Sequence, residues 1–276
     1  MDEKGALSGR TALVTGVGGA IGRAIARNLK DSGAYVIGMD RSPLASDSFL
    51  DEVVEADLGG GPVPSIPCPA RELDFVIHGA GGVFREEVGG PEFISDRSVI
   101  DKTINDNFVS FMDLVAICRP AMTSDSSITV LSSINAIVPF GLPIYSATKG
   151  AVNSFVIAMA PQLLNQGIRL NAVAMGTVDH PGLRDLQAAD VDLYERLRST
   201  VPGGKFLTLD EAASGVVAVA VKSRGVAGSV SVIDKGQSNF VALGRGNYLA
   251  TLTSPPTAAK LLRFWITAAW AKLRSR

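Results

Sequence analysis

The stretch Thr11-Ala-Leu-Val-Thr-Gly-Val-Gly-Gly-Ala-Ile-Gly22 decides the fold class of this chain. Its first five residues form a short apolar run that is typical of a buried strand. Glycines then make a tight turn, and helical spacing continues through Leu29. A strand that passes through a glycine-rich turn into a helix places backbone N–H groups and the positive helix end against a phosphate. The stretch therefore predicts a Rossmann-like site for a dinucleotide pyrophosphate.

Further apolar runs predict one α/β domain with a doubly wound, mainly parallel sheet of seven strands and helices on both faces. The first six expected strands are residues 11–15, 34–39, 52–56, 73–77, 128–131 and 167–173. Long helices are expected over 96–122 and 145–164. Right-handed crossovers bring the carboxyl ends of parallel strands to one edge, which collects Thr15, Asp40, His78, Ser133 and Val173.

A second constellation carries acid/base chemistry. Tyr145 and Lys149 are four residues apart in a predicted helix, so they lie one turn apart on the same face. A phenol has a reference pKa of about 10, and an ammonium group one turn away lowers the pKa of a phenol. Ser133, at the end of the preceding strand, can orient an alcohol or carbonyl oxygen. The three residues predict a device that moves a proton on or off a carbinol oxygen.

The residues Ser132-Ser133 and Tyr145-Ser-Ala-Thr-Lys149-Gly-Ala-Val resemble the short-chain dehydrogenase/reductase family. The glycine turn is similar to that family's Thr-Gly-x-x-x-Gly-x-Gly pattern, with Ala20 in place of the middle glycine. The resemblance covers residues 10–237, and within it residues 226–236 are similar to the family's last strand. It implies an NAD(P)-dependent oxidoreductase that transfers a hydride between a secondary alcohol or ketone and nicotinamide.

The resemblance also implies the role of each catalytic residue. Tyr145 is the expected acid/base, Lys149 lowers the pKa of Tyr145 and holds the nicotinamide ribose, and Ser133 steadies the substrate oxygen. An asparagine in the helix over 96–122 is expected to kink that helix and to carry the proton relay. Asn107 is favoured for this role, with Asn105 as the alternative.

Asp40 ends the second strand, where a carboxylate can accept the hydroxyls of the adenosine ribose and repel a 2′-phosphate. Arg41 could in principle bind that phosphate, but the Asp40 carboxylate next to it would repel the phosphate. NAD is therefore expected over NADP. The resemblance completes the set of expected cofactor-binding residues, which is Thr15, Gly16, Gly18, Gly19, Ala20, Ile21, Gly22, Asp40, Asp57, Leu58, Ala80, Gly81, Tyr145, Lys149, Gly176 and Val178.

Apart from Ala20, the sequence departs from the family pattern at four further places. His78-Gly79 replaces two asparagines, Met175 replaces a proline, His180 replaces a threonine and Lys235 replaces a glycine. We interpret His78 as structural, whereas His180 is expected to contact a cofactor phosphate or the substrate, or to face water. These departures support a rival hypothesis, a non-catalytic dinucleotide-binding sensor or scaffold. The intact Ser133, Tyr145 and Lys149 favour an enzyme, with a lyase or isomerase as the second enzymatic alternative.

The substrate is indicated only weakly. The direct link between the second and third strands and the Ala-x-Gly turn at residue 174 are similar to bacterial dihydrodiol dehydrogenases, as is the short spacing from Ser133 to Tyr145. These features point to a cyclic diol. A hydroxysteroid or a polyketide-type biosynthetic intermediate fits the sequence almost as well.

Composition limits the remaining function classes. The 276 residues carry a net charge of −1, which gives no basis for binding nucleic acid. The two cysteines lie far apart and favour a reducing, cytoplasmic setting. No signal peptide, membrane span or metal-ligand spacing is expected.

Domain organisation and assembly follow from the remaining segments. Residues 1–237 are expected to form the dinucleotide-binding domain, with a mobile amphipathic substrate lid at about 181–202. Residues 238–276 form an extension whose helical segment 255–273 is expected to dock on protein, in preference to an anionic membrane surface. A homodimer or homotetramer is expected through outward apolar residues of the two long helices, namely Phe111, Leu114, Phe155 and Met159.

Overall fold

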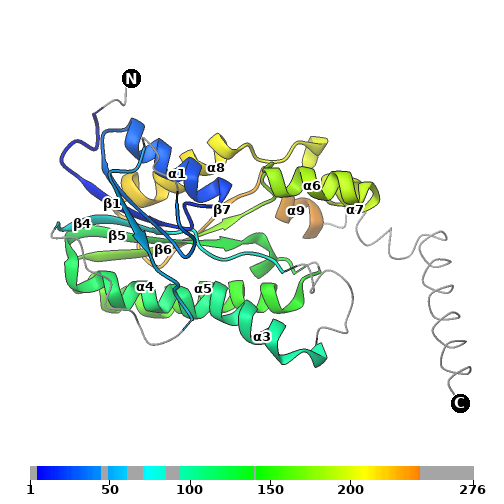
Figure 1. The fold of residues 1–276 in the computed structure, drawn as a ribbon, viewed down its shortest axis with the longest axis horizontal. Coiled ribbons are helices and arrows are strands. Elements are labelled where there is room, and N and C mark those ends of the chain that lie inside the picture. The colour runs from blue at the N-terminus through cyan, green and yellow to red at the C-terminus, as the bar shows by residue number, and fades with distance from the viewer. Residues whose placement is uncertain (1–4, 45–48, 61–70, 85–93, 140, 243–276) are drawn as a thin grey trace, which may run out of the picture. The chain divides into compact units, whose positions relative to one another are not determined.

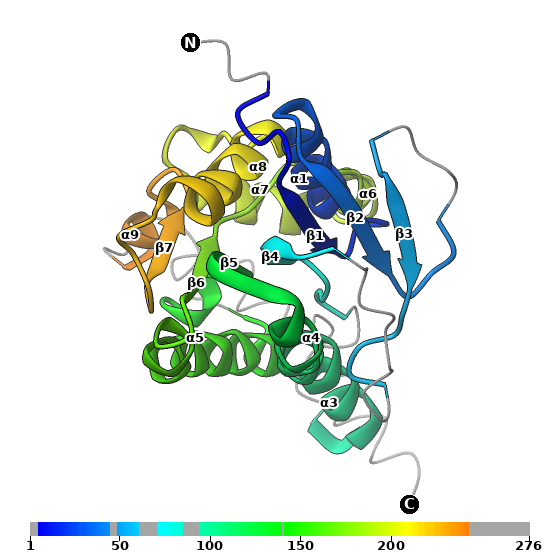
Figure 2. The same ribbon diagram turned by 90° about the vertical axis from the view of Figure 1, so that its left-hand side faces the viewer.

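The computed structural model describes residues 5–44, 49–60, 71–84, 94–139 and 141–242. Seven parallel strands form one sheet in the order β3-β2-β1-β4-β5-β6-β7 (Figures 1 and 2). The strands are β1 (Thr11–Thr15), β2 (Tyr35–Asp40), β3 (Glu52–Glu55), β4 (Leu73–His78), β5 (Met122–Ser133), β6 (Ile168–Met175) and β7 (Val230–Ile233). The predicted doubly wound fold is confirmed.

Helices cover both faces of this sheet. In Figure 1, α1 (Ala20–Asp31) and α8 (Leu209–Val217) lie on one face, and α4 (Ser110–Cys118) and α5 (Pro143–Leu164) lie on the other. Each face has its own apolar cluster, with Ile25 and Val216 in the first and Phe111 and Val156 in the second. The strands β1, β2 and β4 are buried on both sides, which is why they are mainly apolar.

The strand order reverses between β1 and β4, which are hydrogen-bonded neighbours. Thr15 at the end of β1 pairs in register with His78 at the end of β4. Asp40 and Ser133 end β2 and β5 at the same edge. Ligands of open parallel sheets bind at such a reversal, outside the carboxyl ends of the strands. The predicted convergence of strand ends is therefore confirmed.

The long helix predicted over 96–122 is divided in the structure. It consists of α3 (Arg97–Ile104), a π-helical turn η2 (Asn105–Val109), α4 and a 3₁₀ turn that contains Pro120. Met122 was expected at the end of this helix, but it begins β5, which is much longer than the apolar run 128–131. The prediction missed the first half of β5 because that half is polar and half-exposed at the sheet end.

The expectation that Phe111 and Leu114 point outward is wrong. Both side chains are fully buried beneath α4, in the cluster that packs on the sheet. Phe155 and Met159 are half-buried against the same cluster. The segment Ser110–Cys118 is apolar almost all round, so its periodicity did not distinguish the inner face from the outer one.

The chain divides into two compact units, and the described residues of the second are 182–206 and 235–242. Instead of one lid helix, this unit has α6 (Pro181–Ala189) and α7 (Val191–Ser199), because the Asp190 side chain caps the N-terminus of α7. Leu183, Val201 and Phe206 form its buried centre. Its last described helix is α9 (Gln237–Ala242).

Lys235 and Gln237 join the two segments of this second unit. The Lys235 Nζ donates to the Phe206 carbonyl at 3.1 Å, and Gln237 Nε2 donates to Thr200 Oγ1 at 2.7 Å. The predicted helix over 255–273 lies outside the described residues, so the extension and its boundary stay predictions. Among the described residues, no helix is long and apolar enough to cross a membrane.

Candidate active site

The glycine turn has the geometry that a pyrophosphate needs. Gly16 has φ of +73°, and a Cβ there would lie 2.7 Å from the Ala80 nitrogen. A Cβ on Gly22 would lie 2.3 Å from the Gly16 carbonyl oxygen, so glycine is required at both positions. Gly19 caps α1 without a side-chain hydrogen bond, and the first turn of α1 holds no acidic residue. The N-terminal N–H groups of α1 therefore fit an anionic phosphate.

Asp40 faces this turn from the end of β2. Its Oδ2 accepts a hydrogen bond from the Gly18 N–H at 2.9 Å, and its Oδ1 accepts one from the Ser42 N–H at 3.1 Å. The predicted ribose-binding carboxylate and the glycine turn thus lie side by side, although they are 22 residues apart in the chain.

Lys149 lies buried beside Tyr145 on α5. Its Nζ donates to the Leu131 carbonyl of β5 at 2.9 Å and lies 5.6 Å from the centre of the Tyr145 ring. Burial lowers the pKa of Lys149 to about 8, so the ammonium form still dominates at pH 7. The side chain therefore presents a fixed positive charge between β5 and the Tyr145 phenol.

Ser133 is oriented by a residue that sequence reasoning missed. Its Oγ accepts a hydrogen bond from the Asn135 N–H at 3.2 Å, and Asn135 Nδ2 donates to Ser146 Oγ at 3.4 Å. Ser146 follows Tyr145 in the first turns of α5. Asn135 thus ties the end of β5 to the start of α5. Part of this signal was available in principle, because a serine hydroxyl often bonds the backbone N–H two residues further on.

His78 is buried in a complete hydrogen-bond network. Ser110 Oγ donates to the Asp106 carbonyl at 2.9 Å, so it accepts from His78 Nε2–H at 3.2 Å. His78 Nδ1 then accepts from Thr15 Oγ1–H at 2.9 Å. Burial, with the charge of Lys149 adding to it, lowers the pKa of His78 to about 3 and keeps the ring neutral. These contacts support the structural interpretation of His78.

The turn after β4 is fixed from both sides. The Gly79 and Ala80 N–H groups both donate to Thr15 Oγ1 at 3.2 Å. At the other end of the turn, Asn107 Nδ2 donates to the Gly82 carbonyl at 2.9 Å, and Asn107 Oδ1 accepts from the Gly82 N–H at 3.0 Å. Asn107 is fully buried in the π-helical turn η2, which is where a kinked helix was expected.

The other predicted cofactor residues lie further along the sheet edge. Leu58 is buried in the core, and Asp57 beside it is exposed. Gly176 donates its N–H to the Ile233 carbonyl at 2.9 Å, and Val178 forms a parallel bridge with Leu207. His180 is half-buried in the loop that follows. The structure thus places Gly176 and Val178 directly after β6, as predicted.

Comparison with known proteins identifies the family of this chain. A family model described as "Enoyl-(Acyl carrier protein) reductase" matches residues 66–238. A tropinone reductase homologue of Arabidopsis thaliana is 30% identical over 253 residues, which cover 86% of this chain and 95% of that protein. Carbonyl reductase [NADPH] 2 of Sus scrofa is 27% identical over 250 residues, which cover 83% of this chain and 96% of that protein.

A solved structure gives the same fold. The ligand-free aldohexose dehydrogenase of Thermoplasma acidophilum matches with a TM-score of 0.73 at 23% identity, covering 86% of this chain and 96% of that one. The fold and the sequence matches define an oxidoreductase with a Rossmann-like fold. This chain belongs to the short-chain dehydrogenase/reductase family.

Proposed function

We propose that this protein is an NAD-dependent oxidoreductase that interconverts a secondary alcohol and the corresponding ketone. The observation that carries the proposal is the buried ammonium of Lys149 beside the Tyr145 ring, at the strand edge that ends in Ser133. A bound nicotinamide would supply the hydride chemistry. The protein residues would supply the proton, the fixed charge and the orientation of the substrate oxygen.

Each residue has a role that its surroundings support. Tyr145 gives or takes the proton of the carbinol oxygen, and the positive charge of Lys149 stabilises negative charge on the phenol oxygen. Ser133 Oγ accepts the Asn135 N–H, which leaves the serine hydroxyl hydrogen for a substrate oxygen. Asn107, fixed in η2, is the proposed element of the proton relay. A sensor or scaffold would need none of these groups.

The cofactor we propose is NAD. The relatives leave this choice open, since the matched carbonyl reductase is named for NADPH. In this chain the Asp40 carboxylate lies against the glycine turn, where it would accept ribose hydroxyls and repel a 2′-phosphate. The glycine turn itself contains no Lys or Arg that would offset this repulsion.

The substrate class we propose is a secondary alcohol or ketone, with a cyclic diol, a hydroxysteroid and a polyketide-type intermediate as the first compounds to assay. One relative is named a carbonyl reductase and another a tropinone reductase homologue. These names differ, so they do not narrow the substrate class. Cys118 is buried and forms no disulfide, which is compatible with a reducing, cytoplasmic setting.

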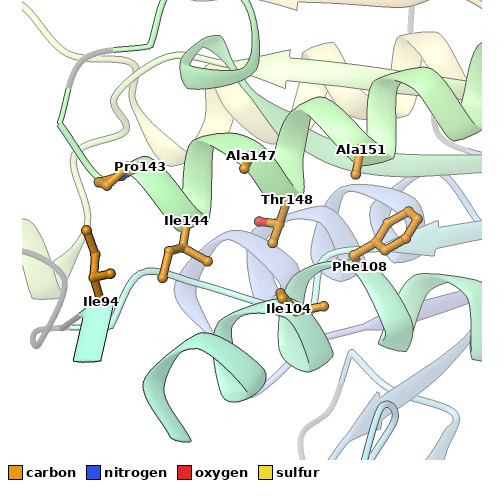
Figure 3. A pocket seen from close by; sticks show the side chains of 8 residues that line it. All are labelled: Ile94, Ile104, Phe108, Pro143, Ile144, Ala147, Thr148 and Ala151. Carbon is orange, nitrogen blue, oxygen red and sulfur yellow. The ribbon is translucent and has the colours of Figure 1, made fainter. Parts of the chain in front are cut away.

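We also propose that the protein is a homo-oligomer that pairs through α3 and α5. An apolar groove of about 430 Å³ lies between these helices (Figure 3). Ile104 and Phe108 project into it from one side, and Ile144, Ala147 and Ala151 of α5 from the other. This surface replaces the buried Phe111 and Leu114 as the apolar face available to a second copy.

The mechanism is tested by Tyr145→Phe, which removes the phenol oxygen and keeps the ring. We expect normal NAD affinity by calorimetry but a loss of turnover of at least about 100-fold, because proton transfer typically contributes that much. Reduced nicotinamide absorbance over a panel of alcohols and ketones measures the turnover.

Tyr35→Phe is the matched control, because Tyr35 begins β2 at the opposite end of the strand from Asp40. This variant should keep full activity. Activity of Tyr145→Phe within a factor of a few of the parent protein would overturn the assignment of Tyr145.

A further inference from the structure

Arg41 is held by an ion pair that the sequence did not indicate. This residue directly follows Asp40, the carboxylate proposed to bind the adenosine ribose. Arg41 Nη1 lies 2.9 Å from Asp106 Oδ2, and the two residues are 65 positions apart in the chain. The pair links the end of β2 to the π-helical turn η2.

A second cation shares the same carboxylate. Lys102 Nζ lies 2.8 Å from Asp106 Oδ2, one helical turn before it. Asp106 therefore carries one negative charge between two positive ones, and its side chain is only 15% exposed, whereas those of Arg41 and Lys102 are about half exposed. Without the Asp106 charge, Arg41, which directly follows Asp40, would lose this ion-pair partner.

Asp106 is well placed to act as a fixed anchor. Its carbonyl accepts the Ser110 hydroxyl, and Asn107, the next residue, is clamped to Gly82. Arg41, by contrast, lies at a strand end and is half exposed, so the position of its guanidinium depends on the partner that it finds. The Asp106 carboxylate lies on a rigid turn, so it fixes the side chain of Arg41, which lies on a less constrained segment.

We propose that Asp106 is a specificity-determining residue that withholds Arg41 from the 2′ position of the cofactor and so reinforces the preference for NAD. The proposal rests on the proposed dinucleotide-binding function. A 2′-phosphate is a dianion, and an arginine is the side chain best suited to bind it. With Arg41 paired to Asp106, such a phosphate meets the Asp40 carboxylate while the cation next to Asp40 is already engaged. NAD has no charge at that position and does not need Arg41.

The test measures dissociation constants for NAD and NADP by calorimetry. Asp106→Asn keeps the shape of the side chain and removes its charge. We expect this variant to bind NADP up to about fivefold more tightly, the upper end of what one exposed ion pair contributes, with NAD affinity within twofold of the parent. The double variant with Arg41→Gln should lose this gain. Lys102→Met alone should leave the ratio of the two constants unchanged.

Arg41→Gln in the parent background gives a second measurement that does not depend on the folding of Asp106→Asn. We expect it to leave NADP affinity unchanged, since Arg41 is already engaged; weaker NADP binding would overturn the proposal. An equal change of both affinities in Asp106→Asn, or a gain that survives Arg41→Gln, would also overturn it. A parent protein that binds neither nucleotide would refute the proposed function itself. A parent protein that binds NAD but gives one of the contrary results above would refute only the role of Asp106.

Discussion

At the scale of single residues, the charged ammonium group of Lys149 is buried, which lowers the stability of the folded protein. Burial lowers its pKa from 10.5 to about 8. Below pH 8 the folded and unfolded chains both hold the proton, so the penalty of burying the charge is fully present. Between pH 8 and 10.5 the folded chain releases the proton first, and the free energy of unfolding rises with pH. A shift of this size corresponds to about 3 kcal/mol.

Lys149→Met should therefore stabilise the cofactor-free protein at pH 7. The variant removes the buried charge but leaves the Leu131 carbonyl without its donor, which costs about 1 kcal/mol. We expect a net gain of roughly 2 kcal/mol in urea unfolding at pH 7, a flatter rise toward pH 10.5, and no activity. Lys205→Met, at an exposed position, is the control and should change neither. A Lys149→Met variant less stable than the parent at pH 7 would contradict this account.

At the scale of elements, the turn after β4 and the turn η2 form one interlocked structure. Gly81 has φ of +116°, and a Cβ at this position would lie 2.7 Å from Asn107 Oδ1. Gly82 is the next residue, yet a Cβ there would meet nothing within 4 Å. The two neighbouring glycines therefore differ. Only at Gly81 would another residue adopt an unfavourable φ and place its Cβ against the Asn107 side chain.

Gly81→Ala should lower stability and weaken NAD binding, whereas Gly82→Ala should do neither. The first change forces an unfavourable φ and displaces the amide that binds Gly82, for which we expect a loss of roughly 2 kcal/mol or more. Urea unfolding and calorimetric titration with NAD measure the two effects. Equal behaviour of the two variants would show that the Asn107 clamp does not position this turn.

At the scale of the whole molecule, the open question is how copies of the chain assemble. The groove in Figure 3 lies between α5 and the segment formed by α3 and η2, and it is lined mainly by apolar residues. We expect the parent protein to sediment as a dimer or tetramer at micromolar concentration. Ala147→Glu, which puts a charge into the groove, should shift it toward the monomer. Ala188→Glu makes the same change at an exposed position of α6 and should not. A monomeric parent protein would exclude the proposed pairing.

The sequence by itself determined the features that depend on neighbours along the chain. The glycine turn after β1, the one-turn spacing of Tyr145 and Lys149, and the placement of Asp40 and Ser133 at strand ends were all readable. They were readable because strands, turns and helices obey local periodicities. Once the strands are parallel, their ends must share one edge. The parallel sheet and the positions of these candidate residues at its edge followed from these rules.

Only the tertiary structure decided which partners those residues have. The network of Thr15, His78 and Ser110, the Asn107 clamp on Gly82 and the pairing of Arg41 with Asp106 join residues 25 to 65 positions apart. No periodicity relates such residues. Likewise, α4 is apolar on nearly every side, and contact with the sheet alone decided that Phe111 and Leu114 face inward. Local sequence determines where strands, turns and helices form, whereas packing between distant segments determines which side chains come into contact.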